Sequence, residues 1–369
     1  MDLGAELERR YANVREAMAM HDLDALVVSG SEYTGFEGAV TYLSGFQIVH
    51  RYAYVVVPAD GDPFALFPTE ARYVGAHGTA RIEQAFHDRP GEHIADRARG
   101  GGWRRIGVYG LDYVMSVRDY RALDGLDVVP FDVEFDLARA VKSKGELDSV
   151  RDSVRINERG FEIFLEHFAP GKTAAQVMAA AEEWFVSEGC GRLTMNMVLT
   201  GADTLARPEF KIARREELLG KFVLPSLEVA GPGMHWVEVS RAIAARGAEL
   251  SVDTQRMLEA YLEYFEAARG AMRPGATCHD VHRVVAAGFV DRGYQLGHVT
   301  GHSIGMTMIE FPKIGEGVET ELQENMVFSM HPHAIAENGE DCLYMQETWL
   351  VTRDGGVPLS ELPMQVCFA

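Results

Sequence analysis

Four side chains could carry acid–base or metal chemistry, and all lie in the second half of the chain: Glu228, Glu238, His302 and His331. His302 lies in the glycine-rich segment 301–305, and His331 directly follows the apolar residues 326–330. A histidine with its ordinary pKa of about 6.5 can take or give a proton at neutral pH. Two histidines and one carboxylate also form a ligand set that suits iron and similar ions. These four residues are therefore compatible with two kinds of function, acid–base catalysis and chemistry at a single metal ion.

Glu228 is a carboxylate within an otherwise apolar, strand-like segment, residues 222–229. A carboxyl group buried there requires a partner or a raised pKa, which makes Glu228 a candidate catalytic base. The alternative is an outward-facing side chain on an edge strand, and the same two possibilities hold for Glu238. For the two histidines, the alternative is a structural hydrogen bond at a turn or at a strand end.

The elements that must position these residues belong to an internal repeat. A Pro-Gly turn followed two residues later by threonine occurs at residues 170–173 and again at 274–277. Three further residues recur at the same offset, namely Val177, Phe185 and Gly189 in the first copy and Val281, Phe289 and Gly293 in the second. Each threonine can cap a helix. The repeat predicts a duplicated α/β unit with pseudo-two-fold symmetry, whose site draws residues from both halves.

The first part of the chain alternates helical and strand-like segments, which indicates an α/β domain. Residues 5–21 have the apolar spacing of an amphipathic helix. Short apolar segments typical of strands follow at residues 25–28, 52–58, 64–67 and 105–109. We predict three parts of the chain, namely an N-terminal domain over residues 1–138, a charged linker helix over 139–158 and a catalytic domain over 159–369.

The composition limits the partners of the protein. Its 369 residues carry a formal charge of −20, with a pI of about 5.1, so nucleic acid and anionic membranes are repelled. No apolar run has the length of a membrane span, and no signal peptide is visible. The four cysteines form no CxxC pair, which is typical of reduced thiols. We expect a cytoplasmic protein that acts on a small molecule and binds neither nucleic acid nor membranes.

Segments along nearly the whole chain resemble the pita-bread family, which includes creatinase, aminopeptidase P, prolidase and methionine aminopeptidase. The resemblance is carried, in chain order, by residues 24–28 (DALVV), 41–46 (TYLSGF), 140–147 (AVKSKGEL), 301–305 (GHSIG), 325–332 (NMVFSMHP) and 347–352 (ETWLVT). It implies an α/β (α+β) protein with an N-terminal creatinase-type α/β domain and a duplicated pita-bread catalytic domain. It also implies a homodimer.

The resemblance also implies where metal ligands would lie. Metal-dependent members use two Asp, one His and two Glu to hold two divalent ions, which generate a hydroxide nucleophile. The first Asp position matches Leu227, or Glu228 if the register differs by one residue. The second Asp position carries Glu238, and the histidine is kept as His302.

The last two ligand positions differ from the family pattern. The first Glu has become His331, and the second has become Gln346. Glu347 follows Gln346, but strand alternation puts the two side chains on opposite faces. We therefore expect no dinuclear metal centre, and we predict that Gln346 and Glu347 contact the substrate.

Two arginines are candidates for binding a substrate carboxylate, because the planar guanidinium group matches that group in shape and charge. Arg207 stands where the resemblance places a catalytic histidine of creatinase, and its alternative is a surface arginine on a loop. Arg51 matches a creatinase arginine that reaches the active site of the other subunit.

The function predicted from the sequence is a creatinase-like small-molecule hydrolase, which cleaves a C–N bond by acid–base catalysis with His302, His331, Glu228 and Glu238. No cofactor is expected in this interpretation. One alternative is a lyase or an oxidase, with one Fe- or Mn-type ion on Glu238, His302 and His331. Another is a binding protein without catalytic activity. A metal-dependent Xaa-Pro peptidase ranks last, because the ligand set is so altered.

Overall fold

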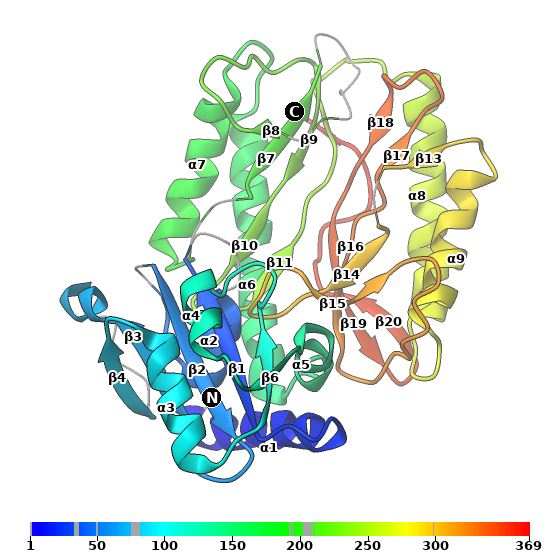
Figure 1. The fold of residues 1–369 in the computed structure, drawn as a ribbon. Helices are drawn as coiled ribbons and strands as arrows, with labels where there is room; N and C mark the ends of the chain where they lie inside the picture. Colours follow the sequence, from blue (N-terminus) through cyan, green and yellow to red (C-terminus); the bar gives the residue numbers. More distant parts are fainter. Residues whose placement is uncertain are drawn as a thin grey trace. The chain divides into compact units, whose positions relative to one another are not determined.

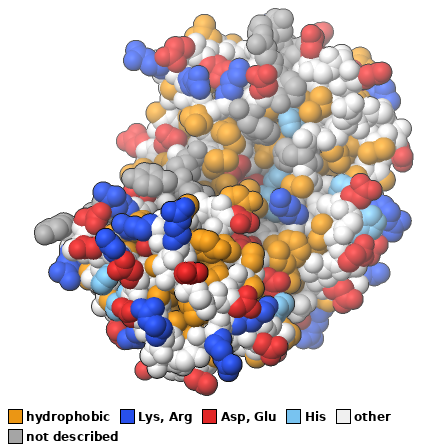
Figure 2. Space-filling view, viewed as in Figure 1, with side chains coloured by type: hydrophobic (Ala, Val, Ile, Leu, Met, Phe, Trp, Pro, Cys, Tyr) orange, Lys and Arg blue, Asp and Glu red, His pale blue; other side chains and the backbone are white. Residues whose placement is uncertain are grey.

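The structure is a computed structural model that describes residues 2–32, 37–48, 51–74, 82–191, 193, 195–201, 209, 211–297 and 299–369. The chain divides into two compact units. The first comprises Met1–Ala140 and Met306–Met308, and the second comprises Val141–Gly305 and Ile309–Ala369. Acidic and basic side chains alternate over the face that Figure 2 shows. In the described part of the chain, no helix is both long enough and apolar enough to cross a membrane.

The N-terminal unit is an α/β domain, in which helices pack on one β-sheet (Figure 1). The strands form one sheet in the order β4-β3-β2-β1-β5-β6. Two apolar clusters form the core of the unit, one containing Leu26 and Val28 and the other containing Ala25 and Val27. Successive β1 residues therefore point to opposite, equally buried faces of the sheet. The elements of this unit are α1 (Leu3–Met20), β1 (Ala25–Ser31), α2 (Glu37–Ser44), β2 (Tyr52–Pro58), β3 (Phe64–Pro68), η1 (Thr69–Val74), β4 (Glu83–His87), α3 (Pro90–Gly101), β5 (Arg105–Tyr109), α4 (Val117–Ala122), β6 (Asp127–Pro130) and α5 (Asp132–Ala138).

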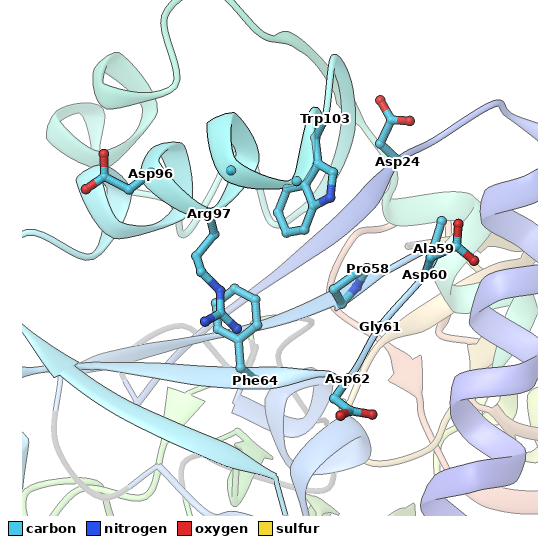
Figure 3. Close-up of a pocket in the computed structure, with 12 residues that line it drawn as sticks. Asp24, Pro58, Ala59, Asp60, Gly61, Asp62, Phe64, Asp96, Arg97 and Trp103 are labelled. Carbon is cyan, nitrogen blue, oxygen red and sulfur yellow. The ribbon is translucent and has the colours of Figure 1, made fainter.

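The N-terminal unit contains a pocket of about 470 Å³ beside β2 and α3 (Figure 3). Two of its charged groups, Asp24 and Arg97, already have partners within the unit. The carboxylate of Asp24 accepts the backbone N–H groups of Arg104 and Arg105 at 2.7 and 2.9 Å. The guanidinium of Arg97 lies over the Phe64 ring, 4.3 Å from its centroid.

The second unit is the duplicated α/β fold that the repeat predicted. Figure 1 shows the helix pairs α6–α7 and α8–α9 on opposite sides of its strands. Its larger sheets have the orders β21-β12-β9-β7-β8 and β15-β14-β16-β19-β20. The elements are α6 (Lys144–His167), α7 (Ala174–Ser187), β7 (Met197–Thr200), β8 (Lys211–Ile212), β9 (Phe222–Ser226), β10 (Glu228–Ala230), β11 (Trp236–Glu238), β12 (Ile243–Ala244), α8 (Val252–Ala271), α9 (Cys278–Val290), β13 (Gln295–Leu296), β14 (Gly301–Ser303), β15 (Glu310–Ile314), β16 (Val327–Met330), β17 (Ala334–Ile335), β18 (Cys342–Leu343), β19 (Glu347–Thr352), β20 (Gly355–Pro358) and β21 (Cys367–Phe368).

The helix predicted as a linker over residues 139–158 is α6, which the structure extends to His167. One face of α6 is buried within the second unit, where the side-chain amide of Asn157 donates to the carbonyl of Leu227 at 2.8 Å. Helix α6 therefore lies wholly within the second unit and supports the strands that carry the candidate site.

The two copies of the repeat begin their second helix in the same way. Thr173 caps α7 and Thr277 caps α9, and each forms a capping box with the residue three positions later. A capping box satisfies two backbone N–H groups that the first helical turn leaves unpaired. The duplication is thus preserved in local hydrogen bonding.

Replacing Thr173 or Thr277 with alanine is expected to lower the free energy of unfolding by about 1 kcal/mol in each case. The two losses should be similar because the two caps have the same geometry. Urea unfolding of the single variants measures this, with the serine variants as controls that keep the capping oxygen. Equal stability of the alanine and serine variants would contradict the capping role.

Candidate active site

The first half of the second unit contributes two glutamates on the hairpin β10–β11. Glu228 and Glu238 are directly paired across this hairpin, so their side chains leave the same face. Both are buried. The structure thus places Glu228 in the cluster, whereas Leu227 contributes only its backbone N–H and a buried apolar side chain.

The second half contributes two histidines. His302 lies on β14 and His331 directly follows β16, and their ring centroids are 5.1 Å apart. The Nε2 atom of His302 lies 3.3 Å from Glu238 Oε1, and that of His331 lies 3.7 Å from Glu238 Oε2. The hydroxyl of Ser329 donates to Glu238 Oε2 at 2.6 Å. The repeat predicted a site built from both halves, and the Glu238 carboxylate lies where the two halves meet.

The environments of the two glutamates shift their pKa values in opposite directions. Burial, followed by the negative charge of Glu238, raises the pKa of Glu228 well above its ordinary value. Burial also acts to raise the pKa of Glu238, but the nearby His302 and His331 charges outweigh it and lower that pKa to about 2. Glu228 therefore keeps its proton at pH values at which Glu238 is ionised.

Replacing Glu228 with glutamine is expected to stabilise the metal-free protein increasingly, relative to wild type, as the pH rises from about 5 to 8. The unfolded carboxyl ionises near pH 4.3, whereas the folded one keeps its proton to higher pH, so the stability that it contributes is present below about 4.3 and is lost as the pH rises. Glutamine resembles the protonated form and cannot ionise.

The difference between the two proteins should change by up to about 1.4 kcal/mol per pH unit. Urea unfolding at several pH values in EDTA measures it, and titrating groups outside the cluster cancel because both proteins contain them. A difference that is constant with pH would contradict a protonated Glu228.

The pKa of His302 is raised from its ordinary value. Burial acts to lower this pKa, but the charge and hydrogen bond of Glu238 and the backbone carbonyl of Ser303 outweigh the effect. The Nδ1 atom of His302 lies 3.0 Å from that carbonyl, which orients the ring toward Glu238. His302 is thus held as the protonated partner of a buried carboxylate.

Tyr344 is a member of the cluster that the sequence interpretation missed. Its ring centroid lies 5.8 Å from that of His331, and its side chain is hydrogen-bonded to Ser226, whose hydroxyl donates to Glu228 Oε1 at 2.8 Å. Burial and the two glutamates raise the pKa of Tyr344 well above its ordinary value. Its position two residues before Gln346 is the signal that could have indicated a shared face.

Glu347 does not join the cluster. Its carboxylate forms an ion pair of 2.6 Å with Arg241, and both side chains are fully buried. Ser360 also hydrogen-bonds this carboxylate through its backbone N–H and its hydroxyl. In the structure, the side chains of Gln346 and Glu347 point in opposite directions, as the alternation along the strand predicted. The substrate contact predicted for Glu347 has no support in this geometry, because its carboxylate is already bonded within the protein.

Of the two predicted substrate arginines, the structure describes Arg51 alone, and no described contact brings it to the cluster. Arg51 belongs to the N-terminal unit, has a left-handed backbone with φ of 60° and pairs with Glu70 at 3.0 Å from a half-exposed position. Arg207 lies outside the described residues.

The cluster does not fit a pair of metal ions, but its donor atoms fit one. Ligand atoms of Glu238, His302 and His331 all lie within 4.8 Å of one another. This two-histidine, one-carboxylate set suits a single ion such as iron or manganese. Two ions would need bridging carboxylates, whereas two family glutamate positions hold the imidazole of His331 and the neutral amide of Gln346.

A duplicated α/β unit with a buried Glu–His cluster drawn from both halves, preceded by a creatinase-type α/β domain, defines a pita-bread enzyme. The chain belongs to metallopeptidase family M24, whose model matches residues 148–353, and the creatinase/prolidase N-terminal domain matches residues 10–141. The family assignment made from the sequence is thus confirmed.

Relatives of similar length agree with this assignment. The probable dipeptidase PepE of Mycobacterium tuberculosis is 25% identical, over 97% of this chain and 95% of its own. The Xaa-Pro dipeptidase of Pyrococcus furiosus is 23% identical, over 87% and 90%. The solved structure of dipeptidase PepE from Mycobacterium ulcerans, 22% identical, superimposes with a TM-score of 0.83 over 100% of this chain and 99% of its own. The hydrolase class predicted from the sequence is supported by the family and by the names of the two relatives found by sequence.

Proposed function

We propose that the chain hydrolyses a C–N bond of a small amide-type molecule, with His302 and His331 acting as a paired acid and base. The observation that carries the proposal is that both imidazoles lie against one buried carboxylate, Glu238, at 3.3 and 3.7 Å. The pKa of Glu238 is lowered to about 2, while burial and the Glu238 charge raise the pKa of the neighbouring Glu228 well above its ordinary value. A buried charge without a counter-charge is costly. One negative charge therefore favours one imidazolium and one neutral imidazole, which is the arrangement that acid–base hydrolysis needs.

In this mechanism the neutral His331 takes a proton from water as the water oxygen bonds to the carbon of the substrate. The C–N bond then breaks, and the imidazolium of His302 gives its proton to the leaving nitrogen. Glu238 keeps both rings in place and compensates the positive charge as it moves from one ring to the other. Ser329 and Gln346 fix the Glu238 carboxylate through hydrogen bonds.

A second candidate is a metal-dependent peptidase with one ion. The clustering of Glu238, His302 and His331 supports this candidate. The names of the relatives also support it, because they indicate peptide substrates. The interpretation of the sequence had ranked this function last. When bound, the ion would polarise a carbonyl and lower the pKa of water. The lyase, the oxidase and the non-catalytic binding protein have no support from the relatives.

One screen separates the two candidates. Protein purified without chelator is tested on Xaa-Pro dipeptides, other dipeptides and small amides and amidines, in EDTA and in Mn²⁺, and its metal content is measured by elemental mass spectrometry. Turnover that persists in EDTA supports the paired histidines. Turnover only with Mn²⁺, together with one ion per chain, supports the single-metal peptidase and overturns the metal-free mechanism.

A further inference from the structure

The carboxamide of Gln346 lies between the two glutamates and is itself fully buried. Its Nε2 group donates to Glu228 Oε1 at 3.1 Å and to Glu238 Oε2 at 3.0 Å. Its Oε1 atom accepts the backbone N–H of Leu227 at 3.1 Å and the hydroxyl of Ser240 at 2.9 Å. Both ends of the amide are thus bonded within the protein, so Gln346 is not available for the substrate contact predicted from the sequence.

Two buried carboxyl groups on paired strands repel each other if both ionise. Proteins that hold such groups together use a proton, a cation or hydrogen-bond donors between them. Here the NH₂ group points one polarised hydrogen at each carboxyl group, from a position between them. Its partial positive charge and its volume occupy the place that a cation shared by Glu228 and Glu238 would take.

We propose that Gln346 is a positioning residue that substitutes for a metal ion between Glu228 and Glu238, and that it thereby excludes a second ion from this cluster. The proposal is independent of the reaction, because it concerns how the two glutamates are held together. It also explains how a chain of a metallopeptidase family can hold these two carboxyl groups on one amide group in place of a shared metal ion.

The proposal predicts what glutamate would do at this position. A carboxylate can still accept the bonds from the Leu227 backbone and from Ser240, but it has no NH₂ group to donate to Glu228 and Glu238. The Gln346→Glu variant should therefore have three carboxyl groups facing one point, together with His331 nearby. Carboxylate oxygens and imidazole are ligands that Mn²⁺ accepts. We expect this variant to bind one more Mn²⁺ ion per chain than the wild-type protein.

The test is Mn²⁺ titration of chelator-treated wild-type and Gln346→Glu proteins by isothermal titration calorimetry. Elemental mass spectrometry after gel filtration gives the stoichiometry. The variant should gain one ion per chain, and Mn²⁺ should raise its melting temperature by several degrees more than that of the wild type. This readout needs no substrate, so failure of the proposed reaction would leave it unaffected.

The matched control is the double variant Glu228→Gln with Gln346→Glu. It has the same number of carboxyl groups in this cluster as the wild type, and its one amide, now at position 228, can donate to the carboxyl group at position 346. Its Mn²⁺ stoichiometry should therefore return to the wild-type value. A wild-type protein that binds two ions per chain would overturn the proposal. A Gln346→Glu variant with unchanged stoichiometry, or one that does not fold even with Mn²⁺ present, would overturn it equally.

Discussion

Replacing Arg241 with methionine is expected to lower the free energy of unfolding by about 3–5 kcal/mol, because it leaves the buried charge of Glu347 without a partner. Both side chains have no exposed area, and their ion pair is 2.6 Å long. The guanidinium also donates to the carbonyls of Gln346, Leu362 and Pro363. Methionine fills similar volume but leaves these acceptors unsatisfied, which adds to the loss.

Urea or guanidinium unfolding measures this change, and a surface ion pair provides the control. Arg353 pairs with Glu324 at 2.9 Å, but its side chain is 81% exposed. Replacing Arg353 with methionine should therefore cost less than about 1 kcal/mol. The double variant Arg241→Met with Glu347→Met should recover part of the lost stability, since no buried charge remains. Equal losses for the Arg241 and Arg353 variants would contradict a structural role for the buried pair.

The position of Arg241 shows why one prediction from the sequence was incomplete. Alternation along a strand was enough to place Gln346 and Glu347 on opposite faces, because it depends only on local geometry. It could not show that Arg241, more than a hundred residues earlier, neutralises Glu347 on the far face. A carboxylate beside a candidate ligand position therefore looked available for substrate, although a distant residue had already bonded it.

The choice between Leu227 and Glu228 required the structure for a similar reason. Residue 227 lies between two strands, since β9 ends at Ser226 and β10 begins at Glu228. Which side chain faces the cluster depends on the register of the β10–β11 hairpin, and a shift of one residue would exchange the two faces. That register is set by the turn over residues 231–235, where Met234 has a left-handed φ of 64°.

The fold and the four central residues were more accessible to prediction. The Pro-Gly-x-Thr repeat and the capping threonines are local signals, and they indicated that residues from both halves would meet. The hydrogen-bonding network around Glu238 could not be predicted in this way, because it joins segments that are far apart in sequence. Ser329, Gln346 and Tyr344 are common residue types whose role appears only when those segments are packed together.

Replacing His302 with glutamine is expected to lower kcat by about 10²–10⁴-fold. The variant should still fold, because His331 can supply the positive charge that the buried Glu238 needs. The side-chain amide of glutamine can donate to Glu238 Oε1 as His302 Nε2 does at 3.3 Å, but it cannot give up a proton to a leaving nitrogen. The raised pKa of His302 adds a second expectation, since a general acid is lost as the pH rises above its pKa. Wild-type kcat should therefore fall at alkaline pH.

The measurement is a pH–rate profile with the substrate that the screen identifies, with thermal unfolding as the check on folding. The matched control is His282→Gln, because His282 lies on α9 with its Nδ1 atom 2.6 Å from the hydroxyl of Thr300 and is not in the cluster. That variant should stay within a few-fold of wild-type kcat. If both the His302→Gln and the His282→Gln variants retain wild-type kcat, His302 is not the general acid. If His302→Gln loses activity only together with its fold, the histidine is structural. A folded His302→Gln variant with lowered residual kcat and no alkaline limb would support acid catalysis by His302, because the amide can keep the hydrogen bond to Glu238 but has no proton to give to a leaving nitrogen.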